Sequence, residues 1–324
     1  MKPLQPIPLQ QVKAARRRLR GKVVRTPLVP LNASQSAASI YLKLENLQPI
    51  GSFKLRGAAN AMLACDPELV RQGVYTASAG NMAQGVAYQA QRMGVQCKVL
   101  VPDHAPRTKC RAVERLGGEV IKVPFEEWWR VLVEHEHPRM RGLFLHPVSD
   151  ERVMAGNGTI ALEILEDLPD VEAVVIPFGG GGLSCGIASA LRALKPEVRV
   201  YAAEVETAAP LKASLLKGEA ASIDYRASFV DGIGGKSVLS EMWPLARRLL
   251  HDSLVVSLAE TAQALRLTAE RNHVIAEGAG AAAVAAALGG GAGQGKVVCV
   301  ISGGNIDSER LIAVLSGRPP HEIP

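Results

Sequence analysis

The stretch ENLQPIGSFKLRGAAN, residues 45–60, places a lysine between two apolar residues at the head of a predicted helix. Lys54 follows an Ile-Gly-Ser turn and is flanked by Phe53 and Leu55. A positive charge is unfavourable at this end of a helix because the free backbone N–H groups there carry partial positive charge. The side chain could simply extend to water. Alternatively, its surroundings disfavour the charged ammonium, and the lysine is a neutral, reactive amine.

The sequence around this stretch alternates between strand-like and helix-like segments. Strands are predicted at 39–45, 96–102, 119–124, 173–178, 198–204 and 296–301. Helices are predicted at 53–64, 82–93, 109–116 and 183–194. Such alternation is typical of parallel sheets covered by helices, and 324 residues suffice for two domains. We therefore predict a two-domain α/β fold, with the charged segment 126–141 as a candidate joint between the domains.

Composition and charge limit the classes of partner. Hydrophobic residues make up 48% and charged residues 21%, which is ordinary for a soluble globular protein. Aromatic residues are only 4%, which argues against single-stranded nucleic-acid binding by base stacking. Part of the net charge of +6 lies in the basic segment 12–25, which has no acidic residue. We interpret this segment as a solvated amphipathic helix followed by a strand, and we expect no nucleic-acid partner because no binding motif accompanies it.

Cysteine use and hydrophobic runs indicate a cytoplasmic protein. The cysteines are scattered, form no C-x-x-C pair and are odd in number: Cys65, Cys97, Cys110, Cys185 and Cys299. This pattern fits reduced thiols rather than disulfides or a zinc site. The N-terminal residues lack the apolar core of a signal peptide. The alanine-rich run 279–288 is too short to span a bilayer, so we expect no membrane partner.

Three glycine-containing stretches follow predicted strands: SAGN at 78–81, GGGGL at 179–183 and SGGN at 302–305. In α/β folds, ligands bind beyond the carboxyl ends of the strands, where all three stretches would lie. The run 179–182 could present successive backbone N–H groups to a phosphate at the start of the following helix. It could instead be a tight turn that lets strand and helix pack closely. A P-loop and a dinucleotide fingerprint are both absent from the sequence, so a single phosphate is the better match.

A reactive lysine, one phosphate loop and polar residues on two further loops together indicate pyridoxal phosphate. This cofactor bonds to a lysine amine through its aldehyde and acts as an electron sink. The hypothesis requires Lys54 and the loops at 78–81, 179–183 and 302–305 to meet at one site.

At this point the sequence resembles a known family. The motifs GSFKLRGAAN, SAGNMAQGVA, GGGGLSCGIA, AEGAGAAAVAAAL and SGGNID occur in the order found in fold-type II pyridoxal-phosphate enzymes, and are most similar to the serine/threonine dehydratase and serine racemase branch. The resemblance extends from about residue 8 to residue 317. It implies a tryptophan synthase β-like fold, in which 1–45 and 147–324 form a large cofactor-binding domain and 46–146 a small substrate-side domain. It also implies a homodimer.

The resemblance assigns the cofactor contacts residue by residue. Lys54 would carry the cofactor and remove the Cα proton of the substrate, while Phe53 would pack beside the cofactor ring. Asn81 would bind the ring hydroxyl, although it could merely cap a helix. Ser302 would face the pyridine nitrogen and leave it largely unprotonated, although it could be a turn residue. The phosphate would be held by the backbone of Gly179, Gly180, Gly181, Gly182 and Leu183.

Ser78, Ala79, Gly80 and Asn81 would contact the substrate carboxylate in the same family pattern. Ala79 stands where the racemase has a second serine, and reprotonation from the opposite face of the cofactor needs such an acid. Elimination of water from a 3-hydroxy-L-amino acid needs only Lys54 and help for the leaving hydroxyl. We therefore predict a dehydratase that releases a 2-oxo acid and ammonia. The alternatives are a racemase, a β-replacement synthase, disfavoured by the QPIGSFK turn, and a non-catalytic cofactor- or amino-acid-binding protein.

Three departures from the dehydratase pattern bear on specificity and metal binding. Met82 stands in place of a histidine, and Val148 replaces an aromatic residue in HPVSD at 146–150. The lost volume predicts a bulkier β-substituent, such as the phenyl group of phenylserine, unless repacking compensates. In the metal motif, Glu204 and Ala208 match but Pro210 stands at the position of a carboxylate; although Glu206 could substitute, we expect no bound metal. Because the sequence ends soon after SGGNID, we also expect no C-terminal regulatory domain.

Overall fold

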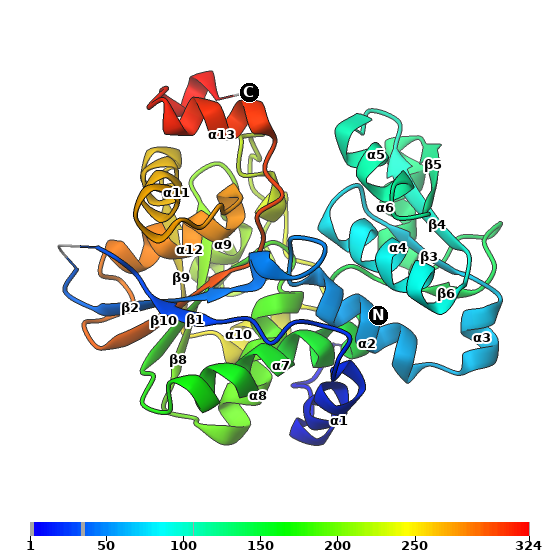
Figure 1. Cartoon of the computed structure of the whole chain (residues 1–324), viewed down its shortest axis with the longest axis horizontal. Helices are drawn as coiled ribbons and strands as arrows, with labels where there is room; N and C mark the ends of the chain where they lie inside the picture. The colour runs from blue at the N-terminus through cyan, green and yellow to red at the C-terminus, as the bar shows by residue number, and fades with distance from the viewer. Residues whose placement is uncertain (1–2, 34–35, 106, 324) are drawn as a thin grey trace.

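The computed structural model describes residues 3–33, 36–105 and 107–323. It contains two sheets, each flanked by helices, and the two lie side by side with the four-stranded sheet to the right in Figure 1. The predicted α/β class is therefore confirmed. Each sheet is built largely from parallel strands whose residues are buried on both faces, as expected when helices cover both sides.

The six-stranded sheet has the order β1-β2-β10-β7-β8-β9. Only β1 runs antiparallel to its neighbour. Its strands are β1 (Leu28–Pro30), β2 (Ser39–Leu44), β7 (Ala173–Pro177), β8 (Arg199–Val205), β9 (Asp252–Val256) and β10 (Lys296–Ile301). The four-stranded sheet has the order β5-β4-β3-β6 and is parallel throughout. It consists of β3 (Val74–Ala77), β4 (Cys97–Pro102), β5 (Glu119–Val123) and β6 (Leu143–Phe144).

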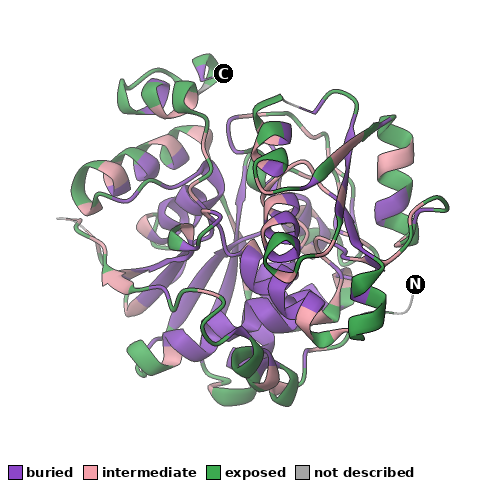
Figure 2. Cartoon of the chain, turned by 45° about the vertical axis from the view of Figure 1, so that its right-hand side comes forward, coloured by how far each residue is buried: buried purple, intermediate pink, exposed green. Residues whose placement is uncertain are grey.

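Helices bury both faces of the six-stranded sheet (Figure 2). One face, which includes Val174 and Ile176, packs against α1 (Leu9–Leu19), α7 (Glu151–Asp167), α8 (Gly182–Leu194) and α10 (Trp243–Leu249). The other face, which includes Val175, packs against α11 (Leu258–Asn272), α12 (Gly278–Leu288) and α13 (Ser308–Leu315). The remaining elements beside this sheet are α9 (Pro210–Lys217) and the short 3₁₀ helices η1 (Glu45–Leu47), η2 (Asp231–Ile233) and η3 (Pro320–Glu322).

The four-stranded sheet is covered by α2 (Lys54–Ala64), α4 (Asn81–Met93) and α5 (Arg107–Glu114) on one face and by α6 (Phe125–Glu134) on the other; α3 (Pro67–Arg71) completes this part of the chain. The predicted joint at 126–141 is wrong. Most of it is the amphipathic helix α6, whose Val131 and Leu132 pack on Tyr75 and Leu100 of the sheet. The charges lie on the outer face of that helix, which is why the segment looks like a linker in the sequence.

Helix α2 joins the two parts of the molecule, since it packs against both α4 and α7. Helices α2 and α7 approach closely at Gly156 of α7, which has no side chain. A Cβ at this position would overlap the carbonyl oxygen of Arg56 in α2. Each sheet falls within one of the two predicted domains, 46–146 and the remainder; the boundaries themselves remain a prediction. Within the described ranges, no helix combines the length and the apolarity needed to cross a membrane.

Candidate active site

All the residues predicted to bind cofactor or substrate line one cavity of about 730 Å³. Loops of both sheets contribute to it. The six-stranded sheet supplies the loops after β7 and β10, and the four-stranded sheet supplies the loop after β3. The cavity thus lies beyond the carboxyl ends of parallel strands, where a ligand site is expected.

The turn before α2 is paired with the loop after β10, although the two are far apart in the sequence. The Phe53 N–H donates to the Ser302 carbonyl over 3.0 Å, and the Gly304 N–H donates to the Gly51 carbonyl over 2.9 Å. A β-bridge joins Ser52 to Gly303 between these two contacts. These backbone contacts hold the start of α2, and therefore Lys54, beside the SGGN loop.

The amine of Lys54 lies in the cavity, on a side chain that is part-buried. Its Nζ donates a 2.6 Å hydrogen bond to the carbonyl of Pro147 and lies 5.2 Å from the centroid of the Phe53 ring. Burial lowers the pKa of Lys54 to about 8, against a smaller opposing effect of the Glu277 carboxylate. The neutral fraction of this amine near neutral pH is therefore much larger than that of an ordinary lysine, as the reactive-lysine interpretation requires.

His146 shapes the turn that holds the amine. Its Nδ1 accepts hydrogen bonds from the N–H groups of Val148 and Ser149, at 3.1 and 2.8 Å, so the ring donates through Nε2 to the Leu132 carbonyl. Burial lowers the pKa of His146 to about 3, which keeps the ring neutral. The first residue of the HPVSD motif thus orients the carbonyl of Pro147 toward Lys54.

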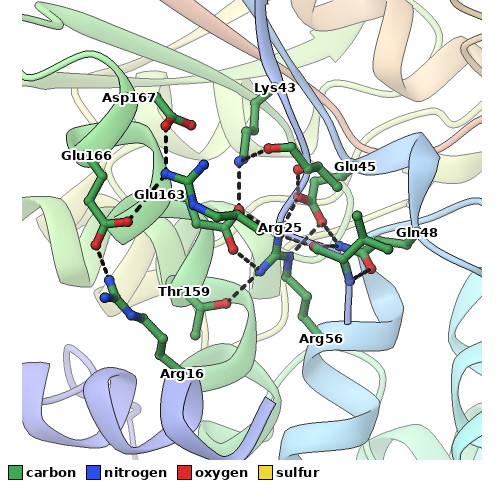
Figure 3. Close-up of polar contacts among 12 residues, drawn as sticks. Arg16, Arg25, Lys43, Glu45, Gln48, Arg56, Thr159, Glu163, Glu166 and Asp167 are labelled. Atoms are coloured by element: carbon green, nitrogen blue, oxygen red, sulfur yellow. Dashed lines mark hydrogen bonds and ion pairs between the residues drawn. The ribbon is translucent and has the colours of Figure 1, made fainter. Parts of the chain in front are cut away.

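A buried ionic network anchors α2 two residues beyond Lys54 (Figure 3). The Arg56 guanidinium donates to both carboxylate oxygens of Glu45 at 2.8 Å and to both of Glu163 at 2.7 and 2.9 Å. Lys43 adds a 2.6 Å contact to Glu163. Burial alone would raise the pKa of Glu45, but the Arg56 charge holds it below its ordinary value. The network joins β2, η1 and α7 to α2, and so holds the lysine-bearing helix in place.

The glycine loop at 179–183 has the structure of an anion cradle. Gly181 adopts φ +94°, a left-handed conformation that favours glycine, and caps the 13-residue helix α8. A Cβ on Gly180 would lie 2.6 Å from both Cγ atoms of Val148, and one on Gly182 would lie 2.6 Å from the Val148 carbonyl oxygen. Within the described part of the chain, the N–H groups of residues 179–181 have no backbone acceptor. These free donors at a helix N-terminus fit a phosphate group.

The SAGN loop brings Asn81 to the cavity, but its amide is already engaged. Asn81 Nδ2 donates to both carboxylate oxygens of Glu277 at 3.0 and 3.1 Å, and its Oδ1 accepts from Asn305 at 2.8 Å. The Gly80 N–H donates to the Ser78 hydroxyl over 3.2 Å, so one predicted carboxylate donor is used within the loop. The alternative that Asn81 caps the helix is wrong, because Gly80 occupies the N-cap position and Asn81 is the first residue of α4 itself.

The two carboxylates considered as metal ligands instead stabilise helix N-termini. Glu204 accepts hydrogen bonds from the N–H groups of Leu211 and Lys212 in α9, at 2.9 and 2.8 Å, and from Ser253 at 2.6 Å. Glu206 accepts from the N–H of Leu258 at the start of α11. Among the residues that the structure describes, no group of three or more histidine, cysteine or acidic side chains could hold a metal ion.

Several residues of the cavity were not identified from the sequence. Glu277 and Asn305 lie within the quoted AEGAGA and SGGN motifs, but nothing local shows that they contact Asn81. The small-sheet side adds an aromatic pair, Phe125 and Trp128, with ring centroids 5.7 Å apart. The signal for this pair is the aromatic cluster at 125–129, which looks like part of a joint in the sequence. The same side also adds His104, Arg111 and Arg115.

Together, the cavity residues fit pyridoxal phosphate. A buried amine of lowered pKa suits its aldehyde, and a cradle of unpaired N–H groups suits its phosphate. Lys54, Asn81, Ser302 and the glycine loop would hold the cofactor. Val148 packs against this loop and also lines the cavity.

Comparisons with known proteins agree with this geometry. A family model described as "Pyridoxal-phosphate dependent enzyme" matches residues 19–303. The chain is 39% identical over 315 residues to a protein of Thermotoga maritima named L-threonine ammonia-lyase, and this match covers 96% of the chain and 78% of the relative.

Two solved structures extend the comparison. A threonine deaminase of T.th. superposes with a TM-score of 0.83 at 35% identity, covering 92% of this chain and 98% of its own. Maize serine racemase superposes with a TM-score of 0.85 at 29% identity, covering 97% and 98%. The resemblance to fold-type II enzymes of the serine/threonine dehydratase branch is confirmed. The chain belongs to the family of pyridoxal-phosphate dependent enzymes, and its cofactor is pyridoxal 5'-phosphate.

Proposed function

We propose that this enzyme is a dehydratase, or ammonia-lyase, that eliminates water from a 3-hydroxy-L-amino acid and releases a 2-oxo acid and ammonia. The observation that carries the proposal is the amine of Lys54, held in the cavity by Pro147 with a lowered pKa. The relative from Thermotoga maritima, named L-threonine ammonia-lyase, supports the same reaction class.

The residues of this chain would carry the reaction as follows. The neutral Nζ of Lys54 accepts the proton from the substrate Cα, the bond between Cβ and the hydroxyl oxygen breaks, and the leaving hydroxyl takes up one proton to depart as water, so that Lys54 is neutral again after the step. Bound pyridoxal phosphate supplies the electron sink for the pair left at Cα. The resulting enamine takes up a proton at its β-carbon, and water then replaces nitrogen at Cα to give the 2-oxo acid and ammonia. Ser302, which is buried at the cavity wall, would face the cofactor nitrogen with a hydroxyl.

The substrate carboxylate would bind at the SAGN loop. Ser78, Ala79 and Gly80 line the cavity immediately before α4, where the helix N-terminus favours an anion. The contact between the Gly80 N–H and the Ser78 hydroxyl would exchange for a contact to the carboxylate. In this way the loop would set the substrate Cα beside Lys54.

We propose that the site also accepts a β-substituent larger than the methyl group of threonine, including the aryl group of phenylserine. Val148, which lines the cavity, has a smaller side chain than the aromatic residue of the family pattern. The aromatic pair of Phe125 and Trp128 offers an apolar wall in the same cavity.

Racemisation is the second candidate, because maize serine racemase has a similar structure. A racemase needs an acid on the face of the substrate opposite Lys54, and Ala79 supplies none at the position of the racemase serine. Ala79 therefore favours elimination.

We also propose a compartment, an oligomeric state and a domain division for this enzyme. Free cysteines, four of the five buried, support a reducing cytoplasm, and the resemblance supports a homodimer. The proposed division remains 46–146 as the small domain within a larger cofactor-binding domain.

The test is release of 2-oxo acid and ammonia from a panel of 3-hydroxy amino acids. We expect turnover of L-threonine, L-serine and L-threo-phenylserine, and loss of turnover in Lys54→Ala. Equal release of the D-enantiomer without keto acid would instead support the racemase. A large preference for L-threonine over L-threo-phenylserine would refute the aryl proposal alone.

A further inference from the structure

We propose that Glu277 is a positioning residue of this active site, which fixes the amide of Asn81 and supplies the negative charge that faces the amine of Lys54. The inference rests on the proposed roles of Lys54 and Asn81. Glu277 belongs to none of the contacts that the proposed function uses, although its carboxylate lines the same cavity.

The backbone around Glu277 is shaped to admit its carboxylate. The residue lies immediately before α12, is only 8% exposed, and is tied to the SGGN loop by a 2.9 Å bond from its N–H to the Gly303 carbonyl. A Cβ on Gly303 would lie 2.6 Å from Glu277 Oε1, and one on Gly232 would lie 3.3 Å from the same atom. Glycine on both sides leaves the space that the carboxylate fills.

The hydrogen bonds of Glu277 are directed at Asn81. Both carboxylate oxygens accept from Asn81 Nδ2, at 3.0 and 3.1 Å, while Asn305 donates to the amide oxygen of the same residue at 2.8 Å. Asn305 is in turn tied to the Ile50 carbonyl at 2.9 Å. The Asn81 amide is therefore fixed in one orientation, with its oxygen toward Asn305 and its nitrogen toward Glu277.

The charge of Glu277 has no ion-pair partner among the described residues, which is unusual for a buried carboxylate. The charged groups that face it are Lys54 of α2, Lys109 of α5 and Asp231 of η2. Lys109 is itself paired with Asp231 at 2.8 Å. Lys109 is therefore already neutralised by a carboxylate, whereas the amine of Lys54 contacts a backbone carbonyl. The charge of Lys54 is thus the one that the charge of Glu277 can stabilise.

The electrostatic effect of Glu277 is seen at Lys54. Burial raises the pKa of Glu277 to about 7, and the Asn81 amide opposes that rise. Burial lowers the pKa of Lys54 to about 8, and Glu277 opposes that fall. A negative charge near the lysine favours its protonated form, so removal of the charge must move any protonation midpoint at Lys54 to lower pH.

The experiment is a pH titration of the visible absorption of the holoenzyme, for the wild type, Glu277→Gln and Glu277→Asp. Gln keeps an oxygen that can accept from Asn81 but has no charge. The pH at which the visible absorption change is half complete should therefore fall by about one unit. Asp keeps the charge but is one methylene shorter, so its midpoint should stay near that of the wild type while kcat/KM falls by about 10- to 100-fold. Glu204→Gln is the matched control, because Glu204 is also buried but lies outside the cavity, and it should leave the midpoint unchanged.

An unchanged midpoint in Glu277→Gln at full cofactor occupancy would overturn the proposal. So would an Asp variant whose midpoint falls by about one pH unit below that of the wild type, and this result is available even if the Gln variant does not fold. Failure of the proposed function is a separate result, because it would appear as missing keto-acid release in the wild type while the absorption titrations remain measurable.

Discussion

The lowered pKa of Lys54 predicts a specific pH dependence for the amine in the protein without its cofactor. The pKa lies at about 8 instead of the ordinary 10.5, a difference that burial causes. At pH 7 about one amine in ten would then be neutral, compared with about one in 3,000 for an ordinary lysine, a gain of roughly 300-fold. Because the neutral amine is the nucleophile, capture of the cofactor aldehyde should accelerate as the pH rises to about 8 and then level off.

The assay measures the second-order rate constant of pyridoxal-phosphate capture by the apoprotein between pH 6 and pH 10. Competitive labelling with an amine reagent, read by peptide mass spectrometry, reports the same ionisation at Lys54 itself. Lys13, exposed on α1, is the reference within the same sample. A midpoint near 10.5 at Lys54 would refute the argument that burial of this side chain prepares it for reaction.

Three further substitutions test the frame around the lysine. Arg56→Met should lower the free energy of unfolding in urea by about 3–5 kcal/mol, because it leaves the Glu45 and Glu163 carboxylates buried without their shared guanidinium; a loss below about 1 kcal/mol would contradict this. Gly180→Ala should weaken cofactor binding by about tenfold or more in an equilibrium titration, since its Cβ would meet Val148 at 2.6 Å, and an unchanged Kd would count against the cradle. Val148→Phe should lower the phenylserine-to-threonine ratio of kcat/KM by about tenfold or more, whereas an unchanged ratio would remove Val148 from the specificity argument.

Much of the site could be predicted because its chemistry is concentrated in short motifs. Lys54, Ser302 and the loops at 78–81 and 179–183 each follow or precede a clear strand or helix pattern, and all of them line one cavity. Parallel strands place their carboxyl ends at one edge, so local patterns sufficed to predict that these loops meet.

What could not be predicted depends on contacts between distant residues. Glu277 meets Asn81 across 196 residues, and Arg56 meets Glu163 across 107. No spacing rule relates such pairs, because their meeting is decided by how the helices pack. Segment 126–141 failed for a different reason. The many charged residues on the outer face of α6 make the segment resemble a linker, and the inner face is formed by only a few apolar residues, among them Val131 and Leu132.

The most direct test of the central claim is to locate the cofactor on the chain. The holoenzyme is reduced with borohydride, which makes the bond between cofactor and lysine permanent, and the modified peptide is then identified by mass spectrometry. We expect one modified residue per chain, Lys54, and no stable modification in Lys54→Ala. Modification of a different lysine in the wild type, with turnover retained in Lys54→Ala, would contradict it.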